Sequence, residues 1–84
     1  MFQFLNWSQL SVQIFPNPAG DYINVISSAA IAKISIADVT GRVLIQVENN
    51  STTQLDISKL STGVYFLNLQ MENGELTSYK IIKQ

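Results

Sequence analysis

Residues 61–71 constrain the fold of this chain more than any other part of the sequence. Apolar side chains alternate there with side chains that become more polar along the stretch. The alternating apolar residues are Tyr65, Leu67, Leu69 and Met71. Because successive side chains of a β-strand point to opposite faces, these residues would share one face. The pattern predicts a strand with one face packed against a core and the other only partly covered.

A turn and a glycine precede this strand. Gly63 provides the backbone freedom for a sharp entry from residues 59–62, and Tyr65 follows two positions later. A tyrosine at this place is typical of a tyrosine corner, in which the ring joins the core and the hydroxyl reaches back to the backbone of the turn. We therefore interpret residues 64–71 as the central strand of a small β-sandwich. An ordinary buried strand that contains a tyrosine is the alternative.

Six further segments have the composition of strands and are separated by turn residues. They are residues 11–15, 22–26, 31–38, 43–48, 53–57 and 76–83. The side chains expected on inner faces are Ile23, Val25, Ile34, Ile36, Leu55 and Ile57. Asn73-Gly74 is the strongest hairpin signal, and no segment has a helical period. The chain is thus predicted to be all-β, an immunoglobulin-like antiparallel β-sandwich of about seven strands, with a small barrel as the alternative architecture.

The 84 residues make one domain, near the size at which a single core is marginal. The sequence has no Cys and no His, so packing of its apolar residues (46%) must stabilise it without a disulfide or a zinc ion. Residues 11–84 carry the strand pattern. Residues 1–10 do not, and we interpret them as a linker, an upstream remnant or a vector-derived segment, with a short additional strand as the alternative. Their apolar residues, at positions 1–7, could cause weak self-association.

Charge and composition exclude several classes of partner. Charged residues make up 13% of the chain and balance to a net charge of −1, so the basic surface typical of nucleic-acid or anionic-membrane binding is missing. No stretch approaches the roughly 18 apolar residues of a membrane-spanning helix. The first residues include no basic side chain and no small-residue cleavage site, so we do not expect them to be a secretory signal peptide.

Catalysis and cofactor binding are not expected. Without His or Cys there is no Ser-His or Cys-His pair and no imidazole base, so we predict that the domain is not an enzyme. Asp21, Asp38 and Asp56 could meet at one end of a sandwich and hold Ca²⁺. Separate turn-capping roles are the favoured interpretation, so no catalytic, cofactor or metal residue is assigned.

Aromatic side chains suggest one more kind of site. Tyr22, Phe66, Tyr79 and Trp7 could form a strip that stacks on sugars if they face outward. Packing in the core or at an edge is the commoner fate of such residues.

Four separated motifs together resemble a known family. They are IFPNPA at residues 14–19 followed by Asp21, ISIADVTGRV at 34–43, LSTGVY at 60–65 and KIIK at 80–83. In this order and spacing they resemble the type A-like C-terminal sorting domain of substrates of the type IX (Por) secretion system of Bacteroidota. The resemblance covers about residues 12–83 and implies a seven-stranded immunoglobulin-like sandwich.

The resemblance also implies a function. Such domains stand at the C-terminus of proteases, adhesins and glycan-degrading enzymes whose precursors begin with a Sec signal peptide. The outer-membrane translocon recognises the folded domain, and a sortase-type peptidase usually removes it. The cargo would pass through the periplasm to the outer-membrane surface or the medium, and cleavage would fall within or upstream of residues 1–11. The matching positions, which we assign to recognition, are Pro16, Asn17, Pro18, Gly63, Tyr65, Lys80, Ile82 and Lys83.

A carbohydrate-binding or adhesive immunoglobulin-like module retained on a secreted protein is the alternative function. The position of the last strand favours the sorting signal, because such a signal is expected to end with that strand, as here at Gln84. The lysines also have a structural interpretation. Residues 76–83 are predicted to be an edge strand, on which exposed Lys80 and Lys83 would discourage edge-to-edge aggregation.

Overall fold

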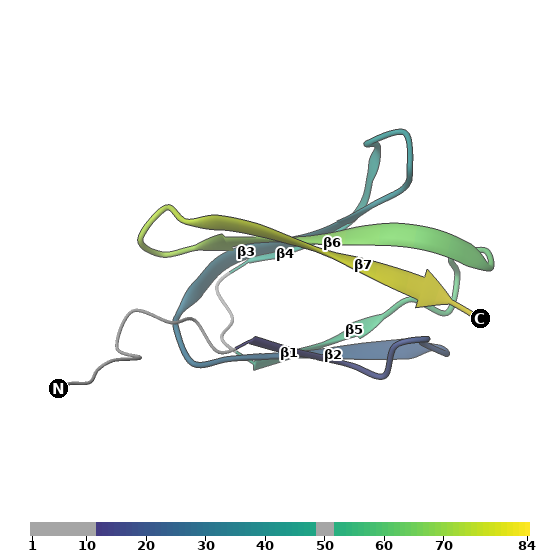
Figure 1. Cartoon of the computed structure of the whole chain (residues 1–84), viewed down its shortest axis with the longest axis horizontal. Coiled ribbons are helices and arrows are strands. Elements are labelled where there is room, and N and C mark those ends of the chain that lie inside the picture. Colours follow the sequence, from purple (N-terminus) through teal and green to yellow (C-terminus); the bar gives the residue numbers. More distant parts are fainter. Residues whose placement is uncertain (1–11, 49–51) are drawn as a thin grey trace, which may run out of the picture.

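The computed structural model describes residues 12–48 and 52–84, which form seven β-strands (Figure 1). The strands are β1 Val12–Phe15, β2 Tyr22–Ser27, β3 Ile31–Ala37, β4 Val43–Glu48, β5 Thr52–Asp56, β6 Gly63–Met71 and β7 Leu76–Lys83. All seven predicted strands are confirmed, and their ends differ from the prediction by at most one residue. The described part of the chain holds no helix that is long and apolar enough to cross a membrane.

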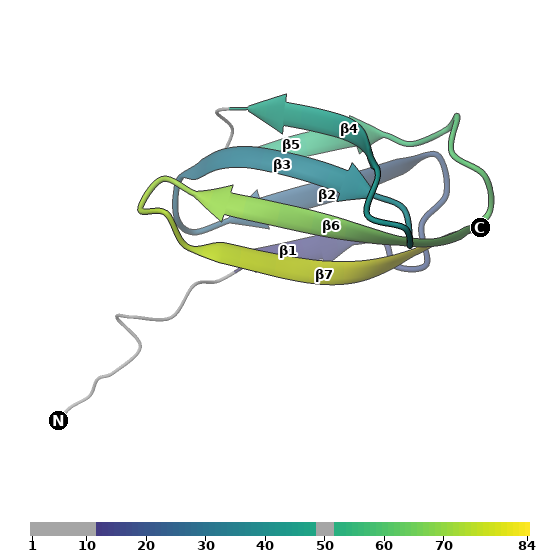
Figure 2. The same ribbon diagram turned by 90° about the horizontal axis from the view of Figure 1, so that it is seen from above.

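The strands form two antiparallel sheets that face each other. The three-stranded sheet has the order β1-β2-β5, and the four-stranded sheet has the order β4-β3-β6-β7. Figure 2 shows β7 and β1 along one edge of the sandwich and β4 and β5 along the opposite edge. This is the predicted immunoglobulin-like sandwich rather than a barrel. Within it β6 pairs with both β3 and β7, so the strand expected to be central lies inside the larger sheet.

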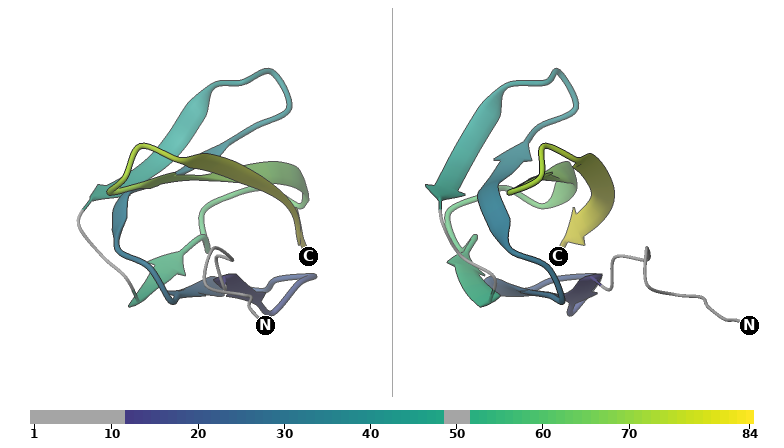
Figure 3. Two further views of the ribbon diagram at one scale, coloured as in Figure 1. Left: turned by 60° about the vertical axis from the view of Figure 1, so that its left-hand side comes forward. Right: turned by 90° about the vertical axis from the view of Figure 1, so that its left-hand side faces the viewer.

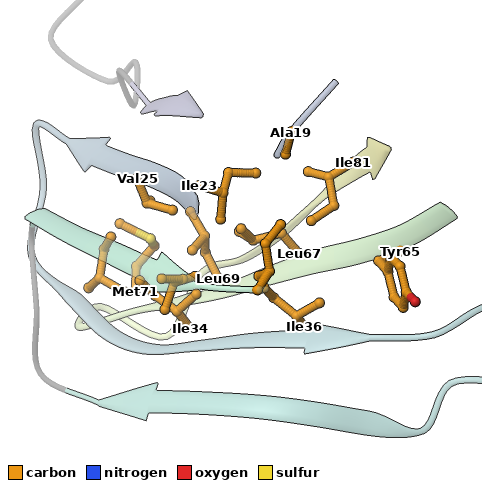
Figure 4. Close-up of a cluster of buried hydrophobic side chains, with 13 residues drawn as sticks. Ala19, Ile23, Val25, Ile34, Ile36, Tyr65, Leu67, Leu69, Met71 and Ile81 are labelled. Atoms are coloured by element: carbon orange, nitrogen blue, oxygen red, sulfur yellow. The ribbon is translucent and has the colours of Figure 1, made fainter. Parts of the chain in front are cut away.

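The core lies between the sheets and follows from the period-two pattern. Every residue predicted on an inner face is buried, and Figure 4 shows their side chains converging from both sheets. The core consists of Ala19, Ile23, Val25, Ile31, Ile34, Ile36, Leu55, Ile57, Tyr65, Leu67, Leu69, Met71 and Ile81. Burying one Leu or Ile side chain contributes about 1.5–3 kcal/mol. Packing of these side chains is therefore the main source of stability in a chain without disulfides.

The tyrosine corner is confirmed at the entry of β6. The Tyr65 ring is 8% exposed, and its hydroxyl donates a hydrogen bond to the backbone oxygen of Ser61 at 2.7 Å. Gly63 has a φ of 154°, a value that L side chains rarely adopt, as the predicted sharp entry requires. Leu60 is partly buried and packs against the core. The turn is thus tied to the central strand through a buried aromatic ring.

The predicted hairpin between β6 and β7 is also confirmed. The backbone N–H of Gly74 donates to the carbonyl of Met71 at 2.9 Å, and Gly74 has a φ of 93°. The Asn73 side chain accepts a hydrogen bond from the backbone N–H of Glu75 at 2.9 Å. An Asn-Gly pair adopts this geometry at low cost. The hairpin fixes the register of β7 against β6 along its whole length.

Candidate functional site

The residues assigned to recognition come from three separate segments that meet at one end of the sandwich. Pro16, Asn17 and Pro18 lie between β1 and β2, Gly63 and Tyr65 begin β6, and Lys80, Ile82 and Lys83 end β7. The β6–β7 register places Gly63 opposite Lys83 and Tyr65 opposite Ile81. Figure 1 shows the C-terminus, the start of β6 and the β1–β2 connection at the same end. The fold therefore gathers motifs that are far apart in the sequence.

The Asn17 side chain bonds directly to the backbone of β7. Its Nδ2 donates to the carbonyl of Lys80, and its Oδ1 accepts from the N–H of Ile82, both at 3.1 Å. A carboxamide offers one acceptor and donors in the same plane, as a peptide group does. The side chain thereby occupies the place of a neighbouring strand. The sequence motif assigned Asn17 to recognition and gave no indication of this contact.

Ala19 extends the same contact by its own backbone. Its N–H donates to the carbonyl of Ile82 at 2.7 Å, and its carbonyl accepts from the N–H of Gln84 at 2.8 Å. The pairing is a parallel bridge between Ala19 and Lys83, and Ala19 itself is fully buried. Because the β1–β2 connection belongs to the three-stranded sheet, these bonds join the two sheets along the β7 edge. We call residues 16–19 with the end of β7 the edge clasp.

Two prolines flank Asn17 within the edge clasp. Both bonds that precede them, Phe15–Pro16 and Asn17–Pro18, are cis, and both proline side chains are exposed. Proline has no N–H and a restricted φ, so neither residue can extend β1 as a regular strand. The chain therefore leaves the three-stranded sheet at these residues.

The predicted exposure of Lys83 is wrong. Its side chain is 7% exposed, and its ammonium group donates to the backbone oxygen of Gln84 at 3.2 Å. Strand alternation sets Lys83 on the same face as Ile81, which is fully buried, and the bridge from Ala19 covers that position. The prediction that β7 is an edge strand is correct, because β7 ends the order of the four-stranded sheet. Its last residues are nevertheless covered by the edge clasp.

Lys80 and Ile82 point the other way, to the outer face of the four-stranded sheet. Lys80 pairs across the ladder with Phe66, and Ile82 pairs with Val64. Val64, Phe66 and Ile82 are 37%, 36% and 39% exposed. From the sequence, Phe66 was considered only for a sugar-stacking strip, and Val64 was not assigned to a site. The sequence did contain a signal for this patch, because the predicted hairpin places the apolar residues Val64 and Ile82 opposite each other.

The three aspartates considered for Ca²⁺ do not gather into one cluster. Asp38 caps the β3–β4 turn: its Oδ1 accepts from the backbone N–H groups of Thr40 at 2.9 Å and Arg42 at 3.1 Å. The pKa of Asp38 is lowered, mainly by the hydrogen bond from the Thr40 hydroxyl. The two backbone hydrogen bonds and the positive charge of Arg42 lower it further. Hydrogen bonds from Ser58 likewise lower the pKa of Asp56. Over residues 12–48 and 52–84, no three acidic side chains come close enough to hold a metal ion.

Of the aromatic residues considered for sugar stacking, the three that the structure describes do not share a surface. Tyr22 lies on the three-stranded sheet, and Phe66 lies on the outer face of the four-stranded sheet. Tyr79 is partly buried and packs against the core. Trp7, like the whole segment 1–7 that was considered for self-association, lies outside the described residues.

A small cavity lies along the other edge of the sandwich, between β4 and the segment after β5. Its volume is about 320 Å³. The lining residues are Leu44, Ile45, Asp56, Ile57, Lys59 and Leu60. Its walls are mostly apolar, and none of the residues assigned to recognition contributes to it.

Comparisons with known proteins agree with this architecture. The crystal structure of CopC from Methylosinus trichosporium OB3b is similar to this chain, with a TM-score of 0.50 and 14% sequence identity over 87% of this chain and 91% of that chain. At this identity the similarity concerns the fold alone. A search of curated proteins found no match. The family model described as "Secretion system C-terminal sorting domain" matches residues 13–84. This match includes every residue assigned to recognition, and the chain belongs to the family of C-terminal sorting domains of the type IX secretion system.

Proposed function

We propose that the outer-membrane translocon of the type IX system recognises this domain in its folded state and thereby selects the parent protein for export. Family membership by itself establishes the general role of the domain. The domain is a sorting signal, covalently part of a cargo protein that is exported through the outer membrane to the cell surface or the extracellular space.

The observation that carries the proposal is the convergence of the family's motifs at one end of the sandwich. Asn17 and Lys80 are 63 positions apart in the sequence and are joined by a hydrogen bond of 3.1 Å. Such an arrangement exists only once both sheets have formed. A receptor that binds this end would therefore distinguish a folded from an unfolded sorting domain, which a linear peptide signal does not allow.

We extend the proposal to transit and cleavage by analogy with the same family. The cargo crosses the periplasm, and a sortase-type peptidase then cuts the chain within or upstream of residues 1–11. The domain contributes no catalysis of its own. Its part in the process is binding, and the chemistry belongs to the peptidase.

The proposal can be tested with a reporter in a type IX-competent bacterium. Residues 1–84 are fused behind a reporter that carries a Sec signal peptide, and the fusion is expressed beside an isogenic strain that lacks the translocon. We expect the reporter outside the cell in the competent strain alone, and mass spectrometry of its C-terminus gives the cleavage site. Retention of the reporter in the periplasm of the competent strain would contradict the proposal.

A core variant separates recognition of the fold from recognition of a linear motif. Leu67 is fully buried and lies outside the assigned residues, so Leu67→Asp unfolds the domain without changing a motif position. We expect this fusion to stay in the periplasm. Export of the Leu67→Asp fusion would show that the translocon recognises a linear peptide instead.

A further inference from the structure

Several of the residues assigned to recognition already have partners inside the domain. Both polar ends of the Asn17 side chain are bonded to β7, and the Tyr65 hydroxyl is bonded to Ser61. Lys83 is buried. Tyr65 and Lys83 are buried, so a receptor could contact their side chains only by disrupting the end of the sandwich. Asn17 is exposed, but both of its polar groups are already bonded to β7. Their motif positions are explained by folding, so the surface that a receptor contacts must be sought among outward-facing residues.

Such residues form one patch on the outer face of the four-stranded sheet. Val64 and Phe66 of β6 lie beside Ile82 and Lys80 of β7 as two consecutive cross-strand pairs on this face. We call these four residues the outer-face patch. The three apolar side chains are each more than one-third exposed, and Lys80 is exposed as well. Side chains of directly facing pairs contact each other, so the patch is continuous.

On β6 the apolar character of this face is confined to the end near the C-terminus, and on β7 an isolated exposed Leu76 lies at the far end. The next cross-strand pair is Asn68 and Ser78, whose side chains are joined by a hydrogen bond of 2.7 Å. The turn between β3 and β4 projects beyond the same side of the sheet, away from the three-stranded sheet (Figure 3). Within that turn, Asp38 and Arg42 form an ion pair at 3.5 Å. The Asn68–Ser78 pair therefore borders the patch along the strands, and the β3–β4 turn carries this ion pair together with the exposed Val39.

The positive charge of Lys80 determines which kind of partner surface complements the patch. Within residues 12–48 and 52–84, its ammonium group has neither an ion pair nor a hydrogen bond. An unpaired ammonium beside exposed Phe66 complements a surface that combines an apolar side chain with a carboxylate. A second copy of this chain fits poorly, because a symmetric contact over the patch would bring two Lys80 side chains together, and like charges facing each other destabilise an interface.

We propose that the outer-face patch is the surface on which a component of the type IX translocon docks, through an apolar side chain packed on Phe66 and a carboxylate paired with Lys80. This proposal rests on the proposed function. Aromatic residues at the centre of an interface commonly provide much of the binding energy, and complementary charge adds specificity. The edge clasp has a positioning role: it holds β7, and with it Lys80 and Ile82, in register with β6.

The test uses the reporter fusion with two patch variants and two matched controls. Lys80→Glu reverses the unpaired charge, and Lys59→Glu makes the same change at an exposed lysine on the opposite edge. Phe66→Thr removes the ring but keeps a strand-forming residue, and Leu76→Thr removes a 74% exposed side chain from the far end of the same face. We expect each patch variant to lower export by at least about tenfold, and each control to stay within about twofold of the unchanged fusion. Thermal unfolding of each purified chain accompanies the assay.

The outcomes distinguish the two proposals. If the unchanged fusion is not exported, the proposed function fails, whatever the variants do. If the unchanged fusion is exported and a folded Lys80→Glu variant is exported equally well, the patch is not the docking surface. This result decides the matter even if Phe66→Thr unfolds. Sedimentation of the purified full chain tests self-association: a dimer that Phe66→Thr converts to a monomer would assign the patch to a second copy and overturn the proposal.

Discussion

Ile82 donates its backbone N–H to the side chain of Asn17 at 3.1 Å, although the two residues lie 65 positions apart in the sequence. The bond satisfies a backbone group on the last strand of the larger sheet, where an unpaired edge would otherwise be available to another chain. A side chain does here what a further strand does elsewhere in a sheet. The motif Pro16-Asn17-Pro18 is therefore part of the support of β7, in addition to ending β1.

The first prediction concerns this support. Asn17→Ala removes two hydrogen bonds to β7 and should lower the free energy of unfolding by about 1–2 kcal/mol in urea denaturation. The amide of Ile82 should then exchange its hydrogen faster. Asn73→Ala is the matched control, because it deletes one local bond to Glu75 and should leave exchange at Ile82 unchanged. Unaltered exchange at Ile82 in Asn17→Ala would refute the edge clasp.

The second prediction separates the two roles of Tyr65. Tyr65→Phe keeps the buried ring and loses the bond to Ser61, so it should lower the free energy of unfolding by about 1 kcal/mol. Tyr65→Ala also creates a cavity and should cost about 3–5 kcal/mol. Thermal and urea unfolding of the two variants measure the difference. Equal and negligible losses would contradict the tyrosine corner.

The third prediction compares two lysines of one strand. Lys83 is 7% exposed, so Lys83→Ala removes buried aliphatic contacts and should destabilise the domain by about 1–2 kcal/mol. Lys80 faces outward, and Lys80→Ala should change stability by less than about 0.5 kcal/mol. Lys83→Met keeps the packed stem without the charge and should restore stability. Equal effects of the two alanine substitutions on urea unfolding would show that both side chains are exposed in solution.

The fourth prediction concerns the pKa of Asp38 and the stability of the fold at acidic pH. Hydrogen bonds, above all the one from Thr40, hold the pKa of Asp38 below its ordinary value near 3.9. A lowered folded-state pKa stabilises the fold above the unfolded-state pKa, and this stabilisation is lost as the pH falls from about 4 through the folded-state pKa. Thr40→Val removes the hydroxyl that donates to Asp38, so it should raise the pKa of Asp38, which NMR titration measures. The pKa of Asp56, which Ser58 lowers, is the internal control and should not move.

Local patterns in the sequence determined most of the fold. The alternation of Tyr65, Leu67, Leu69 and Met71 identified both the strand β6 and its buried face, because strand geometry alone sets that period. Gly74 after Asn73 placed the last hairpin, because few dipeptides accept its backbone angles. The four motifs also identified the family, because their order and spacing along the chain can be read directly from the sequence.

The tertiary structure alone decided which motif residues support the fold and which face outward. Asn17 and Lys80 are both polar residues near strand ends, and nothing in their neighbourhoods reveals that one bonds to the backbone beside the other. The burial of Lys83 depends on Ala19, which arrives from the other sheet. Contacts between distant segments depend on how the sheets pack as wholes, and a local pattern of side chains does not encode that packing.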